Sequence, residues 1–157
     1  MNDGTDRPAR ILIVEDNLGD IRLIREAFQK ANVHRTYEFI VAKDGAEALD
    51  FLHKRGIFGD AAKPDIITLD LNLPKKNGRE VLQEIKTNPI LKGMPVVVFS
   101  SSSSPQDIEA AYRHYANCYV TKPSDLDEFF ACIAGIERYW LQLAQLAGFR
   151  GTSVGNR

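Results

Sequence analysis

The chain has 157 residues, of which 44% are hydrophobic and 26% are charged, and its formal net charge at pH 7 is −1. A chain of this length can bury the core of one ordinary domain, and its composition is typical of a globular protein rather than a disordered one. The near balance of charge provides no overall field that attracts nucleic acid or an anionic membrane surface, so we expect neither as a partner.

The sequence also lacks the usual signs of secretion or membrane insertion. The N-terminal stretch MNDGTDRPAR is polar and has no apolar signal-peptide core. No apolar run approaches the roughly 18 residues that a membrane-spanning helix requires. The two cysteines, Cys118 and Cys132, have neither the number nor the spacing of a disulfide framework or a metal site. We therefore expect a cytoplasmic protein with two reduced thiols.

Five short apolar segments have the length and composition of β-strands. They lie at residues 11–14, 37–42, 65–70, 95–100 and 117–122. Because most of them are apolar at nearly every position rather than at every second one, they indicate strands that are buried on both faces, as in a parallel sheet.

Stretches with a helical spacing of apolar residues follow each of these strands, and residues that favour a helix start precede three of them. The start signals are Asp44 with Glu47, Ser104 with Pro105, and Ser124 with Asp127. The third helix has no such signal beyond the loop-to-helix junction Asn77-Gly78.

The alternation of strands and helices predicts a doubly wound α/β domain, in which five helices cover both faces of a five-stranded parallel sheet. We expect the domain to span residues 9–147 and to include an extended C-terminal helix. Residues 1–8 and the glycine-rich residues 148–157 are expected to form flexible tails.

The carboxyl ends of the predicted strands carry a distinctive set of polar residues. In open parallel sheets the functional site lies outside these ends. The set comprises Glu15 and Asp16 after the first strand, Asp70 at the end of the third, Ser100 at the end of the fourth and Lys122 at the end of the fifth. Neighbouring carboxylates repel one another unless a cation lies among them, and a hard divalent ion such as Mg²⁺ suits their oxygen atoms.

This set contains the groups that phosphoryl transfer to an aspartate requires. Asp70 is the candidate nucleophile. Lys122 is placed to pair with Asp70 at rest and then with a phosphoryl oxygen, to which Ser100 donates a hydrogen bond. The backbone carbonyl of Asn72 is a further candidate metal ligand. A lone aspartate at a strand end is usually a turn former, so the hypothesis depends on the whole set.

Four segments in the same order resemble the receiver domain of two-component response regulators: VEDN (14–17), LDLNLPKKNG (69–78), VVFSS (97–101) and CYVTKP (118–123). The resemblance implies a flavodoxin-like fold with strand order 2-1-3-4-5 and Asp70 as phospho-acceptor. It implies Mg²⁺ or Mn²⁺ as cofactor, held by Asp16, Asp70 and the carbonyl of Asn72, with Glu15 acting through water. It also implies the roles of the residues that follow the later strands: Lys122 as the phosphate-pairing lysine, Ser100 as the switch hydroxyl, Tyr119 as the switch aromatic, and a cis bond between Lys122 and Pro123.

Four further segments resemble the single-domain regulators that are paired with bacterial phytochromes. They are DNLGDIRLIREAF (16–28), GIFGDAAKPD (56–65), the serine run FSSSS (99–103) and IERYWLQL (136–143). The resemblance implies a sensor histidine kinase as partner, with a bacteriophytochrome as the candidate, and a homodimer.

The C-terminal segment around Tyr139, Trp140 and Leu143 is rich in apolar side chains. A single terminal helix can pack all of them on its own sheet, which is the simpler interpretation. We favour a partly exposed apolar stripe used for homodimerisation or kinase docking, because tyrosine and tryptophan often anchor interfaces.

Two functions are compatible with this pattern, and a third, a phosphatase, lacks a required residue. The leading hypothesis is a phospho-switch that catalyses only its own phosphorylation and dephosphorylation, and so is not an enzyme with an external substrate. A phosphatase of the haloacid dehalogenase type requires a second aspartate two residues beyond the nucleophile, where this chain has Asn72. The remaining alternative is a receiver fold that is never phosphorylated and serves only for dimerisation or interaction.

Overall fold

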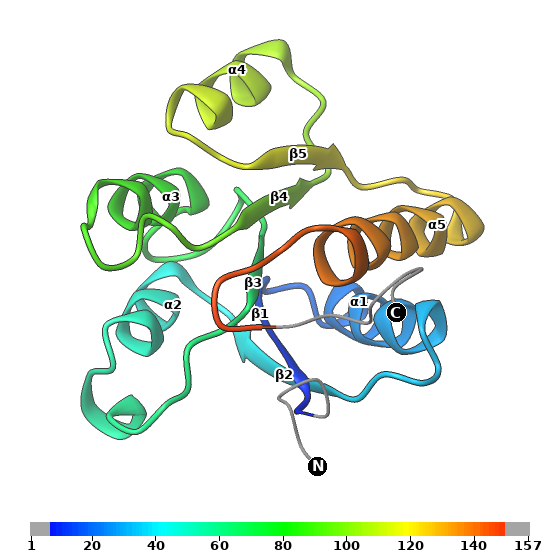
Figure 1. Ribbon diagram of the computed structural model, residues 1–157. Coiled ribbons are helices and arrows are strands. Elements are labelled where there is room, and N and C mark those ends of the chain that lie inside the picture. Colours follow the sequence, from blue (N-terminus) through cyan, green and yellow to red (C-terminus); the bar gives the residue numbers. More distant parts are fainter. Residues whose placement is uncertain (1–6, 150–157) are drawn as a thin grey trace.

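The computed structural model describes residues 7–149 (Figure 1). Residues 1–6 and 150–157, which make up most of the two predicted tails, lie outside the described residues. The elements follow in the order β1 (Ala9–Val14), α1 (Leu18–Ala31), β2 (Tyr37–Ala42), α2 (Gly45–Leu52), a 3₁₀ turn (Gly56–Phe58), β3 (Ile66–Leu69), α3 (Gly78–Thr87), β4 (Val96–Ser100), α4 (Pro105–Arg113), β5 (Cys118–Thr121), α5 (Leu126–Glu137) and a π-helical turn (Arg138–Leu143).

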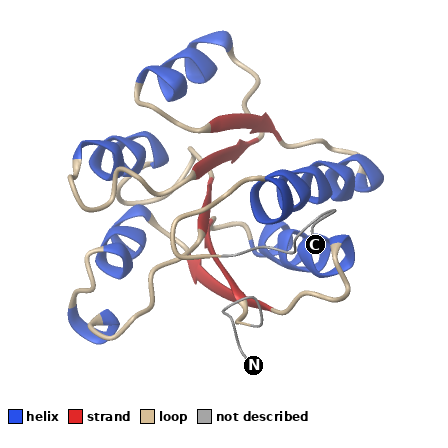
Figure 2. Cartoon of the chain, in the orientation of Figure 1, coloured by secondary structure: helices blue, strands red, loops and turns tan. Residues whose placement is uncertain are grey.

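The strands form one parallel sheet in the order β2-β1-β3-β4-β5. Helices α1 and α5 cover one face, and α2, α3 and α4 lie on the other (Figures 1 and 2). Each face has its own apolar core: Ile13 packs with the α1 and α5 side chains, and the adjacent Val14 packs with those of α2 and α3. The predicted doubly wound α/β fold and its strand order are confirmed.

The strand register brings the carboxyl ends of four strands, β1, β3, β4 and β5, to the same edge of the sheet. Val14 of β1 is paired with Leu69 of β3, so Glu15 and Asp70 each follow directly after a paired residue. Ser100 of β4 is paired with Thr121 of β5, which places Lys122 one residue beyond the same edge. Because side chains alternate between the faces of a strand, a slip of one residue would turn these groups away from one another.

The observed helix caps match the predicted start signals for two helices, α2 and α4, and differ from them for α3 and α5. Asp44 and Ser104 accept hydrogen bonds from the backbone amides three residues ahead, as predicted. The cap of α5 is Asp125 rather than Ser124, because the carboxylate of Asp125 accepts from the amide of Glu128 at 3.0 Å. Helix α3 has a full capping box between Asn77 and Glu80, although the sequence showed only a loop-to-helix junction there.

The chain beyond α5 folds back onto the amino-terminal edge of the sheet. The helix continues only as far as Leu143, through a π-helical turn, and Ala144 is already extended. Leu141 and Phe149 are buried in the core beneath α1 and α5, whereas Tyr139 and Leu143 remain 55% and 49% exposed. The predicted apolar stripe is therefore partly absorbed by the domain itself, and Tyr139 and Leu143 are its exposed members.

A buried carboxylate holds this returning segment in place. The Glu137 side chain is fully buried, and it accepts hydrogen bonds from Arg35 Nε at 2.8 Å, Tyr37 Oη at 2.7 Å and Gln142 Nε2 at 2.6 Å. Arg35 also donates to the carbonyl of Leu141 at 3.1 Å. Burial and the neighbouring Glu137 raise the pKa of Tyr37, so this hydroxyl remains a donor. The network ties β2 and the loop before it to α5 and its π-helical turn.

Replacing Glu137 with Gln tests how much this network stabilises the fold. Removing one charge from a buried ion pair costs about 3–5 kcal/mol, so we expect a loss of that size in the free energy of unfolding measured with urea. Glu38→Gln is the matched control, because Glu38 pairs with Arg10 on the surface at 3.2 Å and exposed pairs contribute only about 0–1 kcal/mol. Equal losses in the two variants would contradict the assigned role of Glu137.

Candidate functional site

Three carboxylates meet at the carboxyl edge of the sheet, at the ends of β1 and β3. One oxygen from each of Glu15, Asp16 and Asp70 lies within 4.8 Å of the others. Glu15 and Asp70 are buried, whereas Asp16 is exposed at the mouth of the site. Hard oxygen donors gathered in this way suit Mg²⁺ or Mn²⁺, so the residues present fit the expected ion.

The ammonium group of Lys122 reaches into this cluster from the end of β5. Its Nζ lies 2.6 Å from Glu15 Oε1, 2.8 Å from Asp20 Oδ2 and 3.2 Å from Asp70 Oδ2. The backbone amide of Lys122 donates to the carbonyl of Ser100 at 2.7 Å, which fixes the point at which the lysine leaves the sheet. The predicted pairing of Lys122 with Asp70 is present, but it is the longest of the three contacts.

Asp20 is a member of the site that the sequence analysis missed. It lies in the first turn of α1, where its amide donates to the side chain of the cap residue Asn17 at 2.9 Å. An acidic residue in this position is usually explained by its interaction with the helix dipole. The sequence therefore gave no reason to assign Asp20 a partner 102 residues away.

The site holds more negative than positive charge. Burial, together with the charge of Asp70, raises the pKa of Glu15 to about 7, although Lys122 and the amide of Asn17 act in the opposite direction. Burial alone would lower the pKa of Lys122, but its hydrogen bonds to Asp20 and Glu15 outweigh that effect and raise the pKa above its usual value. Lys122 is thus a permanent cation, and Glu15 binds and releases a proton near neutral pH.

The backbone around Asp70 is tightly constrained. Asp70 Oδ1 accepts from the amide of Asn72 at 3.2 Å, while Oδ2 faces Lys122. A Cβ at Gly78 would lie 2.2 Å from the carbonyl oxygen of Asp70, so glycine is required for α3 to begin against this strand end. The two oxygens of Asp70 therefore have different neighbours, a lysine on one side and a backbone amide on the other.

Ser100 and Tyr119 are linked through Ser102. The hydroxyl of Ser100 is fully buried and accepts from the amide of Ser102 at 3.3 Å. Tyr119 Oη donates to the carbonyl of Ser102 at 2.7 Å. The hydroxyl of Ser102 donates to Asp107 in α4 at 2.6 Å. The sequence analysis used the serine run only for the family resemblance and for the helix start at Ser104, so this role of Ser102 was not predicted.

The predicted cis bond between Lys122 and Pro123 is wrong, because no peptide bond among residues 7–149 is cis. The trans form of an X-Pro bond is favoured by about 0.5–1 kcal/mol, and only a local constraint reverses that preference. Here Lys122 reaches the acidic cluster with the trans bond, and the chain continues to the Asp125 cap of α5.

Comparison with known proteins identifies the class of protein that has this fold and site. Residues 11–134 match the family model of the response regulator receiver domain, so the chain belongs to that family. The response regulator Rcp1 of Synechocystis sp. is 43% identical over 146 residues, which cover 93% of this chain and 98% of Rcp1.

Two solved structures are also similar. The phosphorylated cyanobacterial phytochrome response regulator RcpA has a TM-score of 0.86 at 47% identity, over 90% of this chain and 99% of that one. The Mn²⁺-bound form of Rcp1 has a TM-score of 0.83 at 44% identity, over 88% of this chain and 99% of that one. The predicted resemblance to phytochrome response regulators is confirmed.

Within residues 7–149, no helix is both long enough and apolar enough to cross a bilayer.

The proton on Glu15 predicts how the stability of the metal-free protein depends on pH. Folding raises the pKa of Glu15 from 4.5 to about 7, so the folded chain binds more protons than the unfolded chain between these values. The free energy of unfolding must therefore fall as the pH rises through this window, by about 2–3 kcal/mol. Lys122 stays charged throughout the window and contributes no slope there.

Urea unfolding in EDTA between pH 4.5 and pH 8 measures this dependence. Glu15→Gln removes the titrating group, so the stability of that variant is expected to change much less over the same range. Parallel curves for the two proteins would show that the pKa of Glu15 is not raised on folding.

Proposed function

We propose that this protein is a phosphorylation-controlled signalling protein in which Asp70 accepts a phosphoryl group from a histidine kinase. The observation that carries the proposal is the position of the Lys122 ammonium, 3.2 Å from Asp70 Oδ2 inside a cluster of buried carboxylates. Membership of the receiver family and similarity to RcpA, a phosphorylated regulator, support it.

In the proposed reaction an Asp70 carboxylate oxygen attacks the phosphorus of a phosphohistidine. The new P–O bond forms as the P–N bond breaks, and the electron pair of the broken bond stays on the imidazole, which takes up a proton. Lys122 leaves its carboxylate partners to pair with a phosphoryl oxygen, and the Ser100 hydroxyl donates to another.

The metal would be held by Asp16, Asp70 and the backbone carbonyl of Asn72, with Glu15 acting through water. When bound, the ion supplies positive charge that offsets the charge developing on the phosphoryl oxygens. The similarity to Rcp1, which binds Mn²⁺, supports this assignment.

The same step moves the switch residues. To donate to the phosphoryl group, Ser100 must turn its hydroxyl, and the hydrogen bond from the amide of Ser102 is then lost. Since Tyr119 is held by the carbonyl of that same residue, a shift of Ser102 releases the Tyr119 ring. Phosphorylation thereby changes the surface formed by α4 and β5.

The wider biological role follows from the similarity to phytochrome regulators. We infer a single receiver domain over residues 9–147 that acts in the cytoplasm with a sensor histidine kinase, for which a bacteriophytochrome is the candidate. We also infer a homodimer, because Tyr139 and Leu143 are half exposed beside Trp140. External catalytic turnover is not expected, since Asn72 stands where a phosphatase of the haloacid dehalogenase type has its acid.

Labelling with acetyl phosphate tests the phospho-acceptor. We expect intact mass to show one phosphoryl group that requires Mg²⁺, is stable in acid and is labile in base. Asp70→Asn should abolish this adduct because it removes the nucleophile, whereas Asp60→Asn, at an exposed aspartate elsewhere, should be labelled normally. Absence of the adduct from the wild type, where a known receiver is labelled, would favour the alternative of a non-phosphorylated interaction module.

A double-mutant cycle tests whether Asp20 acts through Lys122. In Asp20→Asn the ammonium keeps only Glu15 and Asp70 as carboxylate partners, so it competes more strongly with the metal. We expect calorimetry to show Mg²⁺ binding weakened by about three- to tenfold, equivalent to about 0.7–1.4 kcal/mol.

Two controls show whether the change in Mg²⁺ affinity arises through Lys122. In a Lys122→Met background, Asp20→Asn should have little further effect on Mg²⁺ affinity, because the competing ammonium is already absent. Glu26→Gln removes an exposed charge from the same helix and should leave the affinity unchanged. An equal effect of Asp20→Asn in both backgrounds would mean that Asp20 acts on the metal by its charge alone.

A further inference from the structure

An apolar hollow of about 150 Å³ lies at the amino-terminal edge of the sheet, away from Asp70. One wall is the end of α2 and the connection to β3, and the other is the segment between α3 and β4. The apolar lining includes Phe51, Leu52, Ala61, Ile90 and Met94. A hollow of this volume, lined by apolar side chains, admits a group the size of a benzene ring.

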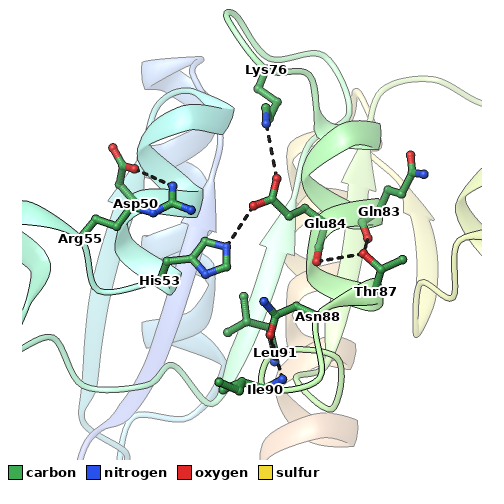
Figure 3. Close-up of polar contacts among 10 residues, drawn as sticks. All are labelled: Asp50, His53, Arg55, Lys76, Gln83, Glu84, Thr87, Asn88, Ile90 and Leu91. Carbon is green, nitrogen blue, oxygen red and sulfur yellow. Dashed lines mark hydrogen bonds and ion pairs between the residues drawn. The ribbon is translucent and has the colours of Figure 1, made fainter.

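Specific hydrogen bonds fix the wall beyond α3. Asn88 Oδ1 accepts from the amides of Ile90 at 2.8 Å and Leu91 at 3.1 Å, which folds the chain into a tight turn at the foot of α3 (Figure 3). Lys86 Nζ donates to the carbonyls of Lys92 at 3.1 Å and Met94 at 2.9 Å. Ile90 is thereby held with its side chain 86% exposed.

The opposite wall is equally well defined. Helix α2 ends in paired hydrogen bonds, from the amide of Lys54 to the carbonyl of Phe51 and from the amide of Arg55 to the carbonyl of Asp50. The Arg55 guanidinium then pairs with the Asp50 carboxylate at 3.1 Å (Figure 3). The ring of Phe58 packs edge-on against Phe51, with 5.5 Å between the ring centres.

A bridge between α2 and α3 holds the two walls together. His53, the residue that caps the end of α2, and Glu84 of α3 point toward one another, with His53 Nε2 3.0 Å from Glu84 Oε2 (Figure 3). Lys76 Nζ approaches the other oxygen of Glu84 at 3.4 Å. The hollow is therefore formed before any ligand arrives, so binding requires little ordering of the protein.

The mouth of the hollow carries positive charge. Lys54 and Lys63 line it and are exposed, and neither has an ion-pair partner within the part of the chain that is described. Of the acidic groups nearby, Asp50 is paired with Arg55, and Glu84 with His53 and Lys76. Asp60, just before Ala61, is exposed and has no ion pair among residues 7–149, so the two lysines at the mouth outnumber one unpaired acid.

The backbone at Lys54 is strained. Its φ of 56° is in the left-handed region, at the position after a helix end where glycine is usual. A lysine there sacrifices some stability, and residues of this kind are concentrated where a ligand or partner binds.

We propose that this hollow binds an acidic segment of a partner protein. The segment inserts one aromatic or large aliphatic side chain into the hollow, while its flanking carboxylates pair with Lys54 and Lys63. The exposed Ile90 at the rim extends the apolar contact. This surface lies at the opposite edge of the domain from the phosphorylation site, so a partner can occupy it while the kinase contacts the Asp70 edge.

Binding of short capped peptides to the full chain tests the proposal. The probe is Glu-Glu-Phe-Glu-Glu, with Glu-Glu-Ala-Glu-Glu and Lys-Lys-Phe-Lys-Lys as controls, and NMR chemical shifts report the site. The acidic phenylalanine peptide is expected to bind at least tenfold more tightly than either control and to shift the signals of Ala61, Ile90 and Met94. Equal binding of the three peptides, or shifts located elsewhere, would overturn the proposal.

Matched variants separate binding from folding. Lys54→Gly is expected to weaken binding of the acidic peptide at least threefold. The same change should raise the thermal midpoint by about 2–4 °C, because the left-handed strain is removed.

Other variants test the rim of the hollow. Ile90→Ser should weaken binding, and Ile57→Ser, at an isoleucine that is 93% exposed but does not line the hollow, should not. Lys63→Glu should also weaken binding of the acidic peptide, whereas Lys43→Glu, at an exposed lysine that does not line the hollow, should not. Unchanged affinity in Lys54→Gly and Ile90→Ser would also overturn the proposal, whatever the result of the labelling at Asp70.

Discussion

The site depends on one ammonium group that is shared among three carboxylates. Lys122 Nζ contacts Glu15 just after β1, Asp20 in α1 and Asp70 just after β3. Only the parallel register of β1, β3, β4 and β5 brings them to one edge. A buried ammonium is stable only when it is paired, and buried carboxylates gathered without a cation repel one another. The cation and the anions therefore each make the burial of the other possible.

Because the Lys122 ammonium is shared, its carboxylate partners are paired unequally and the site keeps an excess of negative charge. The shortest contacts of Lys122 are to Glu15 and Asp20, and the longest is to Asp70, so the proposed nucleophile is the least tightly paired of the three. The excess of negative charge appears in the raised pKa of Glu15. A further cation, whether a proton or a metal ion, relieves that excess. The geometry thus favours binding of a divalent ion.

Sequence reasoning predicted the sheet and the residues at its carboxyl edge because both follow from local patterns. An apolar run that ends in a carboxylate, such as the one before Asp70, is visible without knowledge of any other segment. Asp20, Ser102 and the buried Glu137 were missed because their roles arise from partners distant in sequence or from the backbone of a loop. The trans bond before Pro123 was missed for a different reason, since it departs from the pattern that the family resemblance implied.

The close approach of Gly78 to the backbone of Asp70 has a mechanical consequence. Helix α3 begins in contact with the strand end that carries the acidic cluster, and its amide at Gly78 donates to the carbonyl of Leu71 at 3.0 Å. Ten residues of helix, about 15 Å at 1.5 Å per residue, connect this point to the turn at Asn88. Because a helix is stiffer along its axis than a loop, α3 forms a rigid connection between the two edges of the domain. A displacement of the Asp70 strand end would therefore be expected to move α3 as one body, including its end near Asn88.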